Sequence, residues 1–413
     1  MNTYPKYKDS GEQWLGQIPE HWEMMQWHFL MQENATPNTD CQETQQLQFK
    51  YGEIIPKANQ EVDEDVKKII CKYNKVQPND IMINGLNLNY DFISQRIGMV
   101  RENGIITSAY ISLRPTAIAN PSFYNYLLKA MDARKMFHGM GTGVRLTLSY
   151  KELKNKYLPF PPKEEQEAMV AYLDEQTGAI DKAIQREQAM IDLLEERKQI
   201  IIQNAVTKGL NPNAPMKDSG IDWIKEMPAH WKLMQYRHLF YNLDNLRQPI
   251  TADQRSRNNP QYDYYGASGV IDKIDYYNVD DKVLLIGEDG ANLLMRNLPL
   301  IYKAEGKFWV NNHAHILKPI RDDYDFMALV MEAADYTIFI TGSAQPKLSQ
   351  ANLNSVKLPI PPIEEQKAIV DYVTTATEPI DKAIEAKNRV IALLQERKQI
   401  IISEVVTGKI KIS

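Results

Sequence analysis

The chain has little cysteine, no long apolar run and no excess of positive charge. Only Cys41 and Cys71 occur among 413 residues, which predicts two free thiols rather than a disulfide framework or a thiolate metal site. No apolar stretch approaches the roughly 18 residues that cross a membrane, and residues 1–6 lack the apolar segment of a signal peptide. We therefore expect a cytoplasmic protein. A formal net charge of −5 argues against bulk positive charge as the means of holding nucleic acid.

Motifs of nucleotide and methyl-transfer chemistry are also missing. There is no GxxxxGK[ST] phosphate loop, and no GxGxxG lies between a strand and a helix of a dinucleotide fold. The two Pro-Pro pairs, at 161–162 and 361–362, are not part of the Asn/Asp-Pro-Pro-aromatic motif of an amino-methyltransferase. These absences predict a chain without catalytic residues and without a bound cofactor or metal.

What the chain does contain is an internal duplication. Residues 158–207 align without a gap with residues 358–407, and 28 of the 50 positions are identical. A shorter repeat pairs residues 8–26 with residues 217–235 and includes a His-Trp pair in each copy. The register shift is 209 in the short repeat and 200 in the long one, so the segments between them differ in length by nine residues. Two similar frames that carry different inserts indicate one task performed on two targets.

Each long repeat predicts a helical region. Pro-Pro followed by Glu-Glu, at 161–165 and 361–365, is a helix start, since proline is tolerated in the first turn and acidic side chains there complement the helix dipole. Gly178 and Pro379 then predict a break, so that a short helix precedes a long one of about 27 residues, roughly 40 Å, in each copy. That length is close to the ~34 to 36 Å between half-sites one DNA turn apart.

The long helices carry apolar residues at coiled-coil spacing, in alternating steps of seven and three. Ordinary amphipathic helices on separate cores would show a similar period, but duplication supplies each helix with a matching partner in the same chain, which favours an antiparallel pair. The predicted helix-helix packing positions are Ile184, Ile191, Leu194, Ile201, Ile384, Ile391, Leu394 and Ile401.

The inserts are predicted to be mixed α/β. Residues 105–115 and 310–319 are typical of strands, and helical stretches follow near 123–131 and 326–334. The predicted fold class is α+β, with two mixed α/β domains joined by two long antiparallel helices in an internal pseudo-two-fold repeat. The expected domains are residues 1–157, a first helical region 158–210, residues 211–357, and a second helical region 358–413.

A glycine-containing loop closes each insert, at 139–145 and 341–347, and leads to a shared Leu-Ser. Residues 145–157 hold four basic and one acidic side chain, which suits contact with DNA phosphates, although a solvated turn would have the same composition. The amides of Gln345, Asn311 and Asn312 could read adenine edges, and Arg145 and Lys347 could contact guanine or phosphate. The candidate DNA-binding residues are Thr142, Arg145, Lys151, Asn311, Asn312, Ser343, Gln345 and Lys347.

His313-x-His315 could also belong to a metal site. No cysteine or acidic partner stands at a recognised ligand spacing, so strand residues on one face are the favoured interpretation. The His-Trp pairs at 21–22 and 230–231 are expected to close the core of each domain.

The order of these features resembles a known family. A tryptophan-containing lead, a variable α/β domain, a Pro-Pro-x-Glu-Glu-Gln helix start and a Glu-Arg-Lys-Gln-Ile-Ile-Ile segment occur twice, and Gly-Ser-Ala-Gln-Pro-Lys-Leu-Ser stands at 342–349. This arrangement, which covers essentially the whole chain, is similar to the specificity subunit of type I restriction-modification enzymes.

The resemblance implies a division of labour. It implies two domains that each read half of a split DNA target, and helices that set the unread spacer. It also implies two methyltransferase subunits that use S-adenosylmethionine on adenine N6, and restriction/translocase subunits that use ATP and Mg²⁺. Two alternatives remain open from the residues alone: a coiled-coil scaffold that binds other proteins, and a standalone DNA-binding regulator, against which the net acidity counts.

Overall fold

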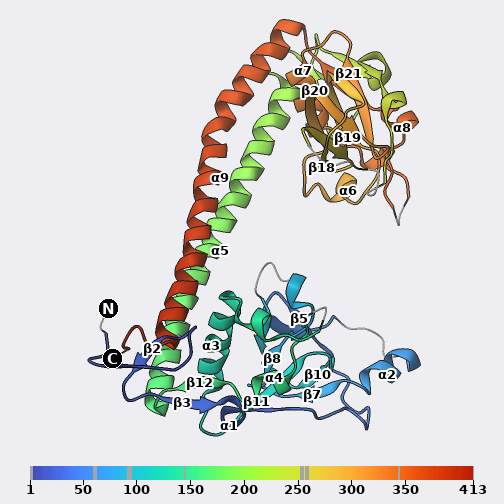
Figure 1. Cartoon of the computed structure of the whole chain (residues 1–413). Coiled ribbons are helices and arrows are strands. Elements are labelled where there is room, and N and C mark those ends of the chain that lie inside the picture. Colours follow the sequence, from blue (N-terminus) through green and yellow to red (C-terminus); the bar gives the residue numbers. More distant parts are fainter. Residues whose placement is uncertain are drawn as a thin grey trace. The chain divides into compact units, whose positions relative to one another are not determined.

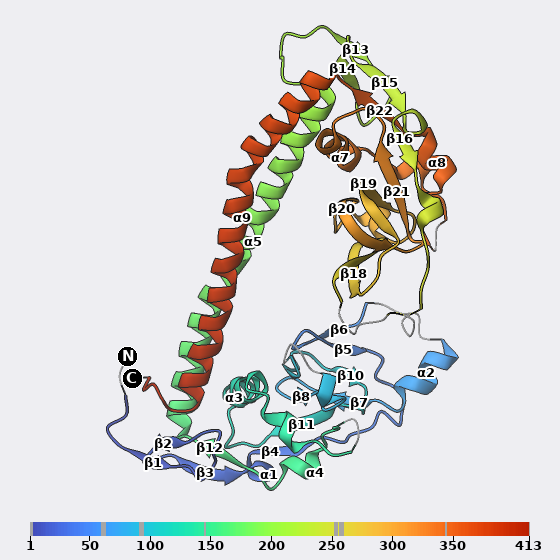
Figure 2. The same ribbon diagram turned by 45° about the horizontal axis from the view of Figure 1, so that its top comes forward.

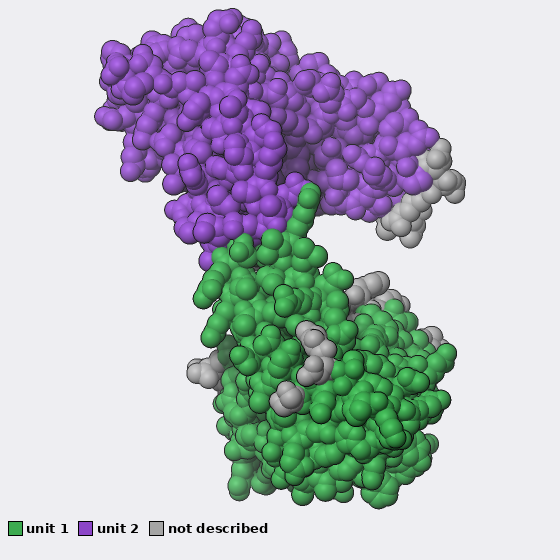
Figure 3. Space-filling view, turned by 90° about the vertical axis from the view of Figure 1, so that its left-hand side faces the viewer, with its two compact units in different colours: residues 1–188, 388–413 green, residues 189–387 purple. Residues whose placement is uncertain are grey.

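The computed structural model describes residues 3–58, 63–90, 95–143, 146–251, 255, 260–342 and 345–412. The chain forms two compact units, residues 1–188 with 388–413, and residues 189–387 (Figure 3). The four segments predicted from the sequence have the boundaries of the repeat, whereas the boundaries between the two compact units fall inside the two long helices. Each unit therefore contains one α/β domain, the first part of one helix and the last part of the other. No helix in the described part of the chain is long and apolar enough to cross a membrane.

The first unit contains many short elements (Figure 1). They are β1 (Tyr7–Asp9), β2 (Gln17–Pro19), β3 (Glu23–Gln26), α1 (Trp27–Leu30), β4 (Met31–Glu33), β5 (Leu47–Lys50), β6 (Glu53–Pro56), α2 (Glu64–Ile70), β7 (Asn74–Val76), β8 (Ile81–Ile83), β9 (Ile97–Met99), β10 (Gly104–Ile106), β11 (Ile111–Pro115), α3 (Pro121–Ala133), α4 (Tyr150–Leu153) and β12 (Tyr157–Phe160). Strands β4-β11-β8-β9 form its main sheet in that order, with every pair antiparallel.

The second unit repeats this topology and extends it. Its elements are β13 (Met216–Asp218), β14 (Glu226–Pro228), β15 (Lys232–Gln235), β16 (Phe240–Asn242), β17 (Tyr262–Gly266), β18 (Gly269–Ile274), β19 (Val279–Gly287), α6 (Asn292–Met295), β20 (Ile301–Val310), β21 (Ala314–Pro319), α7 (Tyr324–Ala333), α8 (Gln350–Ser355) and β22 (Lys357–Ile360). The sheet order β16-β21-β19-β20 matches β4-β11-β8-β9, and β17 and β18 are added at the β20 edge. In Figure 2, β15 lies beside β22, as β3 lies beside β12 in the first unit.

The strands predicted at 105–115 and 310–319 are each broken by a turn. In the first unit β10 ends at Ile106 and pairs with β7, while β11 begins at Ile111 and joins the main sheet. In the second unit β20 ends at Val310 and β21 begins at Ala314. The turns fall at residues 107–110 and 311–313, which include Thr107, Asn311 and Asn312, so each predicted stretch contains parts of two strands rather than one.

The long helices α5 (Lys163–Lys208) and α9 (Ile363–Val406) are each continuous, with 46 and 44 residues. The predicted break at Gly178 and Pro379 is therefore wrong. Proline removes one intrahelical hydrogen bond, but Thr377 and Ile380 on either side of Pro379 are buried, so tertiary packing keeps this turn helical. At 1.5 Å per residue, α5 is about 69 Å long rather than about 40 Å.

The two helices pair in an antiparallel register. Within the first unit, Lys398 Nζ of α9 lies 2.6 Å from Asp181 Oδ1 of α5, and within the second, Lys198 Nζ lies 2.6 Å from Asp381 Oδ1. Both ion pairs belong to one antiparallel register. Lys198 lies 17 residues after Asp181 in α5, and its partner Asp381 lies 17 residues before Lys398 in α9. The predicted packing positions are all buried or half-buried, while residues between them are mostly exposed; they are Ile184, Ile191, Leu194, Ile201, Ile384, Ile391, Leu394 and Ile401.

The repeated His-Trp pairs join the two helices within each unit. Trp22 is fully buried, its indole N–H donates to Glu165 Oε2 at the start of α5 (2.9 Å), and its ring contacts Gly408 just after α9. A Cβ at Gly408 would lie 3.0 Å from the Trp22 ring. In the second unit, Trp231 donates to Glu365 in α9 and contacts Gly209 after α5. Each tryptophan thus fastens the start of one helix to the end of the other.

The glutamine of each Pro-Pro-x-Glu-Glu-Gln motif has an equally defined role. Gln166 is fully buried, donates to Pro161 O (2.9 Å) and accepts from the backbone N–H of Asn120 (2.9 Å), which caps α3. Gln366 makes the same contacts with Pro361 and with Asp323, the cap of α7. The motif therefore orients each long helix relative to the helix of its own domain.

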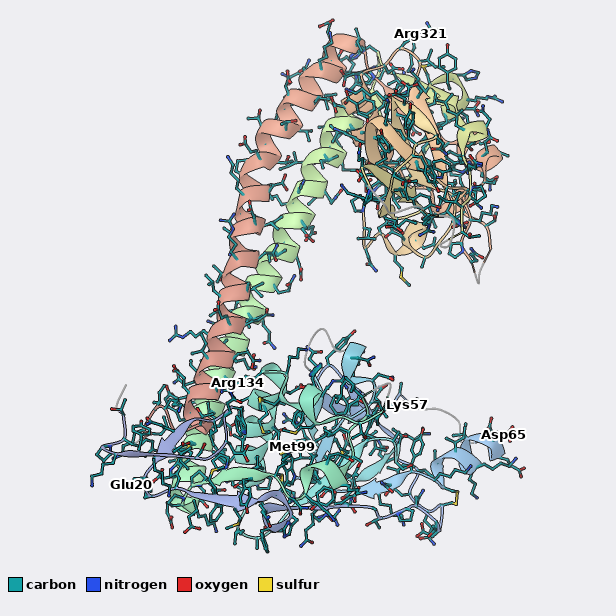
Figure 4. All side chains as sticks on the ribbon, in the orientation of Figure 1. Glu20, Lys57, Asp65, Met99, Arg134 and Arg321 are labelled. Atoms are coloured by element: carbon teal, nitrogen blue, oxygen red, sulfur yellow. A yellow bond between two sulfur atoms is a disulfide. The ribbon has the colours of Figure 1, made fainter. Side chains whose placement is uncertain are left out.

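Further contacts attach the last turns of α9 to the first domain. Arg134, which follows α3, donates from Nη2 to Ser403 Oγ (2.6 Å) and from Nη1 to Trp14 O (3.1 Å); Arg134 is labelled in Figure 4. Val405 shares a hydrophobic cluster with Phe123 and Leu173. In the second unit Val206 of α5 shares a cluster with Phe326 and Val373. The helix ends therefore belong to the domain cores.

The expectation of two free thiols is wrong, because Cys41 and Cys71 form a disulfide with a Cα–Cα distance of 4.8 Å. Backbone hydrogen bonds from Asn38 N to Tyr73 O (2.8 Å) and from Lys75 N to Thr36 O (2.7 Å) align the two segments. The two cysteines are 30 residues apart, and this spacing by itself does not predict a disulfide.

Glu165 offers a test of the helix attachment. Burial favours its protonated form, but hydrogen bonds from Trp22, His21 and Tyr4 outweigh burial, so the pKa of Glu165 is lowered. We expect Glu165→Gln to reduce the free energy of unfolding at pH 7 by about 1–3 kcal/mol, since buried donors lose an ionised acceptor. A carboxylate with a lowered folded pKa stabilises above its unfolded pKa of about 4.3 and loses that contribution as the pH falls through the folded value.

The measurement is urea unfolding of both proteins at pH 7 and at pH 3.5, where the difference between them should shrink. Glu164→Gln is the matched control, because Glu164 neighbours Glu165 in the same helical turn but is exposed. Equal effects of the two substitutions would show that the helix dipole, rather than the tryptophan contact, accounts for the stability.

Candidate nucleic-acid interface

The two glycine-containing loops fold as equivalent hairpins. In the first domain Thr142 N donates to Thr147 O (3.0 Å) and Thr147 N to Thr142 O (2.9 Å). In the second domain Thr341 and Lys347 exchange the same pair of bonds, at 2.9 and 2.7 Å. Two loops of different sequence therefore pair their ends in the same way.

The residue after each hairpin fastens it to the end of a central strand. Leu148 N donates to Gly85 O (2.9 Å), which follows β8, and Leu348 N donates to Glu288 O (2.7 Å), which follows β19. Glycine is required at 85 because a Cβ there would lie 2.5 Å from Leu148 O. At Gly342 the backbone has φ +85°, and a Cβ would lie 2.6 Å from Gln345 O, so a side chain is excluded there too.

In the first domain, the candidate residues on the hairpin and the following helix face solvent. Thr142 is exposed in the hairpin, and Lys151 is exposed on α4, whose first turn is held by a capping box between Ser149 and Glu152. Arg145 lies outside the described residues. Lys154 and Lys156, also exposed, extend the basic segment after α4, so the positive charge of these three lysines is accessible to a polyanion.

In the second domain, exposure separates the candidates. Gln345 and Lys347 are exposed in the hairpin, and Asn312 is exposed in the turn before β21. Ser343 lies outside the described residues. Asn311 is only 5% exposed, and its Oδ1 accepts from His313 N (2.8 Å). Its predicted role in reading a base edge is therefore corrected: this amide shapes the turn, because its acceptor is already used inside the protein.

A cluster of charged side chains that the sequence did not reveal lies beneath the second hairpin. Lys347 Nζ is 3.0 Å from Glu288 Oε1, and the other oxygen of Glu288 accepts from Arg247. Burial favours protonated Glu288, but the hydrogen bonds from Arg247 and Lys347 outweigh it and lower the pKa of Glu288. The charge of Lys347 is partly compensated while its side chain stays 54% exposed, so the side chain is oriented and still accessible.

The two histidines of His313-x-His315 do not lie on one strand face, contrary to the favoured interpretation. His313 lies in the turn before β21 and its Nδ1 is 2.8 Å from Asp289 Oδ2. His315 is in β21 and is fully buried. Across the described residues, no group of three or more histidine, cysteine, aspartate or glutamate side chains could hold a metal ion.

The first domain holds a different buried charge at the corresponding strand. Arg114 of β11 makes two hydrogen bonds of 2.8 Å to Asp80, whose side chain is 1% exposed. Asp80 also accepts from Gln77 N (3.1 Å) and from Asn34 (3.3 Å). The hydrogen bonds that Arg114 donates to Asp80 raise the pKa of Arg114. The corresponding strands β11 and β21 therefore carry unrelated polar networks.

Comparison with known proteins places these features in a family. The profile of the type I restriction modification DNA specificity domain matches residues 42–190 and, separately, residues 230–393. The type I restriction enzyme MjaVIII specificity subunit of Methanocaldococcus jannaschii is 24% identical over 392 residues, which cover 84% of this chain and 82% of that protein. A candidate specificity subunit of Haemophilus influenzae is 31% identical over 136 residues, only 33% of this chain and 34% of that protein.

Solved structures contain the same fold. A chain from a structure of a type I R-M system, described in terms of complex assembly and conformational transition, superposes with a TM-score of 0.65 at 13% identity. The match covers 95% of this chain and 99% of that chain, and at this identity it speaks for the fold alone. The specificity-domain profile matches more than half of the sequence, once in each half. The chain therefore belongs to the family of type I restriction-modification specificity subunits.

Proposed function

We propose that this chain is the non-catalytic DNA-recognition subunit of a type I restriction-modification complex and that it reads a bipartite sequence. In this proposal the domain within residues 1–157 reads one half-site and the domain within residues 211–357 reads the other. Helices α5 and α9 fix the number of unread base pairs between the half-sites. The complex acts where the chromosome is, in the cytoplasm.

The observation that carries the proposal is the pair of equivalent hairpins. Both stand at the end of a central strand, and both lead through Leu-Ser into a short helix. Lys151 and Lys347 offer charge to phosphates, whereas Gln345 and Asn312 present amides that suit adenine edges. One scaffold with two different polar surfaces suits a protein that reads two different sequences.

The chemistry in this proposal belongs to partner subunits. Two methyltransferase subunits bring S-adenosylmethionine and methylate adenine N6, and restriction/translocase subunits bring ATP and Mg²⁺. The chain itself lacks a phosphate-binding loop and the Pro-Pro-aromatic motif of amino-methyltransferases. An internal duplication is well suited to holding two copies of one partner, because each copy can dock on an equivalent surface.

The test is long-read sequencing for N6-methyladenine in cells that express this chain with its methyltransferase subunit. Cells that express the methyltransferase alone are the control. We expect a split motif of two defined half-sites around an undefined spacer, and only when both proteins are present. A continuous motif would contradict bipartite reading, and the same motif in both cultures would show that this chain does not specify the site.

A chimaera assigns each half-site to its domain. When residues 236–357 are replaced by the corresponding insert of another specificity subunit, one half-site should change while the other half-site and the spacer stay. A change in both half-sites would contradict independent reading by the two domains.

A further inference from the structure

His315 connects three segments of the second domain beneath its hairpin. The residue lies in β21 and is fully buried. Its Nδ1 is 2.6 Å from Asp244 Oδ2, in the 3-10 helix η4 (Asp244–Leu246), and its Nε2 is 2.8 Å from the backbone oxygen of Leu348. Leu348 directly follows the hairpin that exposes Gln345 and Lys347. A single imidazole thus joins η4, β21 and the end of the hairpin.

The hydrogen-bond partners define what the ring does. The carbonyl oxygen of Leu348 can only accept, so Nε2 carries a proton. Asp244 is held ionised: burial favours its protonated form, but the hydrogen bond from His315 and that from Ile316 N (2.8 Å) outweigh burial and lower the pKa of Asp244. The ring is thus bonded on both sides, to Asp244 through Nδ1 and to Leu348 through Nε2.

Charged groups on the neighbouring elements reinforce this arrangement. Arg247 Nη2 lies 3.4 Å from Asp244 Oδ2, and Arg247 also contacts Glu288. Glu288 in turn holds Lys347 through its side chain and Leu348 through its backbone oxygen. The end of the hairpin is therefore held on both sides, by Glu288 and by His315.

The first domain has no such anchor at the corresponding position. Pro115 of β11 pairs with the first residue of β4, and Pro319 of β21 pairs with the first residue of β16. Ile111 and His315 each lie four residues before these prolines, so they occupy equivalent positions in β11 and β21. Ile111 is buried and apolar, so its side chain cannot donate a hydrogen bond to Leu148. The imidazole anchor is specific to the second recognition domain.

We propose that His315 is a positioning residue for reading the second half-site, because it fixes the Leu348 carbonyl and with it the placement of Gln345 and Lys347. The inference rests on the proposed function. It adds a residue that affects DNA reading indirectly, through the placement of Gln345 and Lys347. It predicts that a change at His315 affects discrimination at one half-site only. A loss of stability of the whole chain would affect both half-sites together.

Two amide substitutions separate the two contacts of the ring. The side-chain amide nitrogen of asparagine can occupy a position close to that of histidine Nδ1. The side-chain amide nitrogen of glutamine can occupy a position close to that of Nε2. His315→Asn can keep the contact with Asp244 and loses the contact with Leu348, whereas His315→Gln can keep the contact with Leu348. Both variants are purified with their methyltransferase subunits. Dissociation constants are measured at one salt concentration for the cognate duplex and for duplexes with either half-site substituted.

We expect His315→Asn to lower discrimination at the second half-site by about tenfold, the size of one lost buried hydrogen bond. His315→Gln should stay within about threefold of the wild type, and discrimination at the first half-site should be unchanged in both. Equal losses for the two variants, no loss in either, or a parallel loss at both half-sites would each overturn the positioning role. A wild-type complex that does not discriminate at either half-site would overturn the proposed function itself, and the role of His315 with it.

Discussion

Inserting four residues into each long helix, between residues 188 and 189 and between residues 387 and 388, is expected to lengthen the recognised spacer by about two base pairs. Four residues add about 6 Å and slightly more than one helical turn, and the rise of DNA is about 3.4 Å per base pair. These positions are the boundaries between the compact units, so each domain keeps its own helix ends. Both half-sites should stay as they are, and methylation at sites of the original spacing should fall to background.

The register of the helix pair supplies the control. Asp181–Lys398 in one unit and Asp381–Lys198 in the other satisfy one antiparallel register. Paired insertions preserve both contacts, whereas an insertion into α5 alone cannot preserve both without a bulge. The single insertion should therefore abolish methylation at every spacing. Mapping of N6-methyladenine distinguishes the outcomes: altered half-sites after the paired insertion would refute the idea that the helices act only as a spacer.

Replacing Arg114 with alanine is expected to destabilise the first domain by about 1–3 kcal/mol, the cost of leaving a buried carboxylate without its charged donor, although the Arg114 side chain itself is 40% exposed. Asp80 is 1% exposed and receives two hydrogen bonds from Arg114. The remaining donors, Gln77 N and Asn34, are neutral. A carboxylate without its cation in this position is costly, so the denaturation midpoint in guanidinium chloride should fall strongly.

The second domain provides a matched comparison. Lys318 occupies the strand position of Arg114, directly before the paired proline, and contacts Asp281 at 2.7 Å. Its side chain is 44% exposed and that of Asp281 is 30% exposed, so Lys318→Ala should cost at most about 1 kcal/mol. Asp80→Asn combined with Arg114→Ala should recover part of the loss. Equal costs for Arg114→Ala and Lys318→Ala would show that burial of Asp80 does not matter.

Much of the architecture was accessible from the sequence because it is encoded locally and then repeated. The Pro-Pro-x-Glu-Glu motif marks a helix start by rules that involve only neighbouring residues. Apolar residues spaced by seven and three positions mark the side of a helix that packs against another element. The duplication provides a second helix with the same pattern. Gly178 and Pro379 misled the same local reasoning, since contacts from outside the helix outweigh the cost of these residues.

Sites made by distant segments were not accessible in this way. The sequence marks Glu165 and Gln166 as helix-start residues, yet their partners are Trp22, 143 residues away, and Asn120, 46 residues away. The His-x-His pattern suggests a possible metal ligand at His315, but Asp244 and Leu348 determine what this residue does. No spacing rule joins such residues, because their proximity depends on the sheet order.

The sequence by itself determined that the protein has two related halves, where each helical region begins, which residues lie between the helices, and which family the chain belongs to. Only the tertiary structure decided that α5 and α9 are uninterrupted, that Cys41 and Cys71 meet, and that Asn311 is buried while Gln345 and Lys347 are exposed. The reason is physical. Helix signals and periodic burial arise from neighbours in the chain, whereas burial and polar pairing at a loop depend on strands that are brought beside it from far along the sequence.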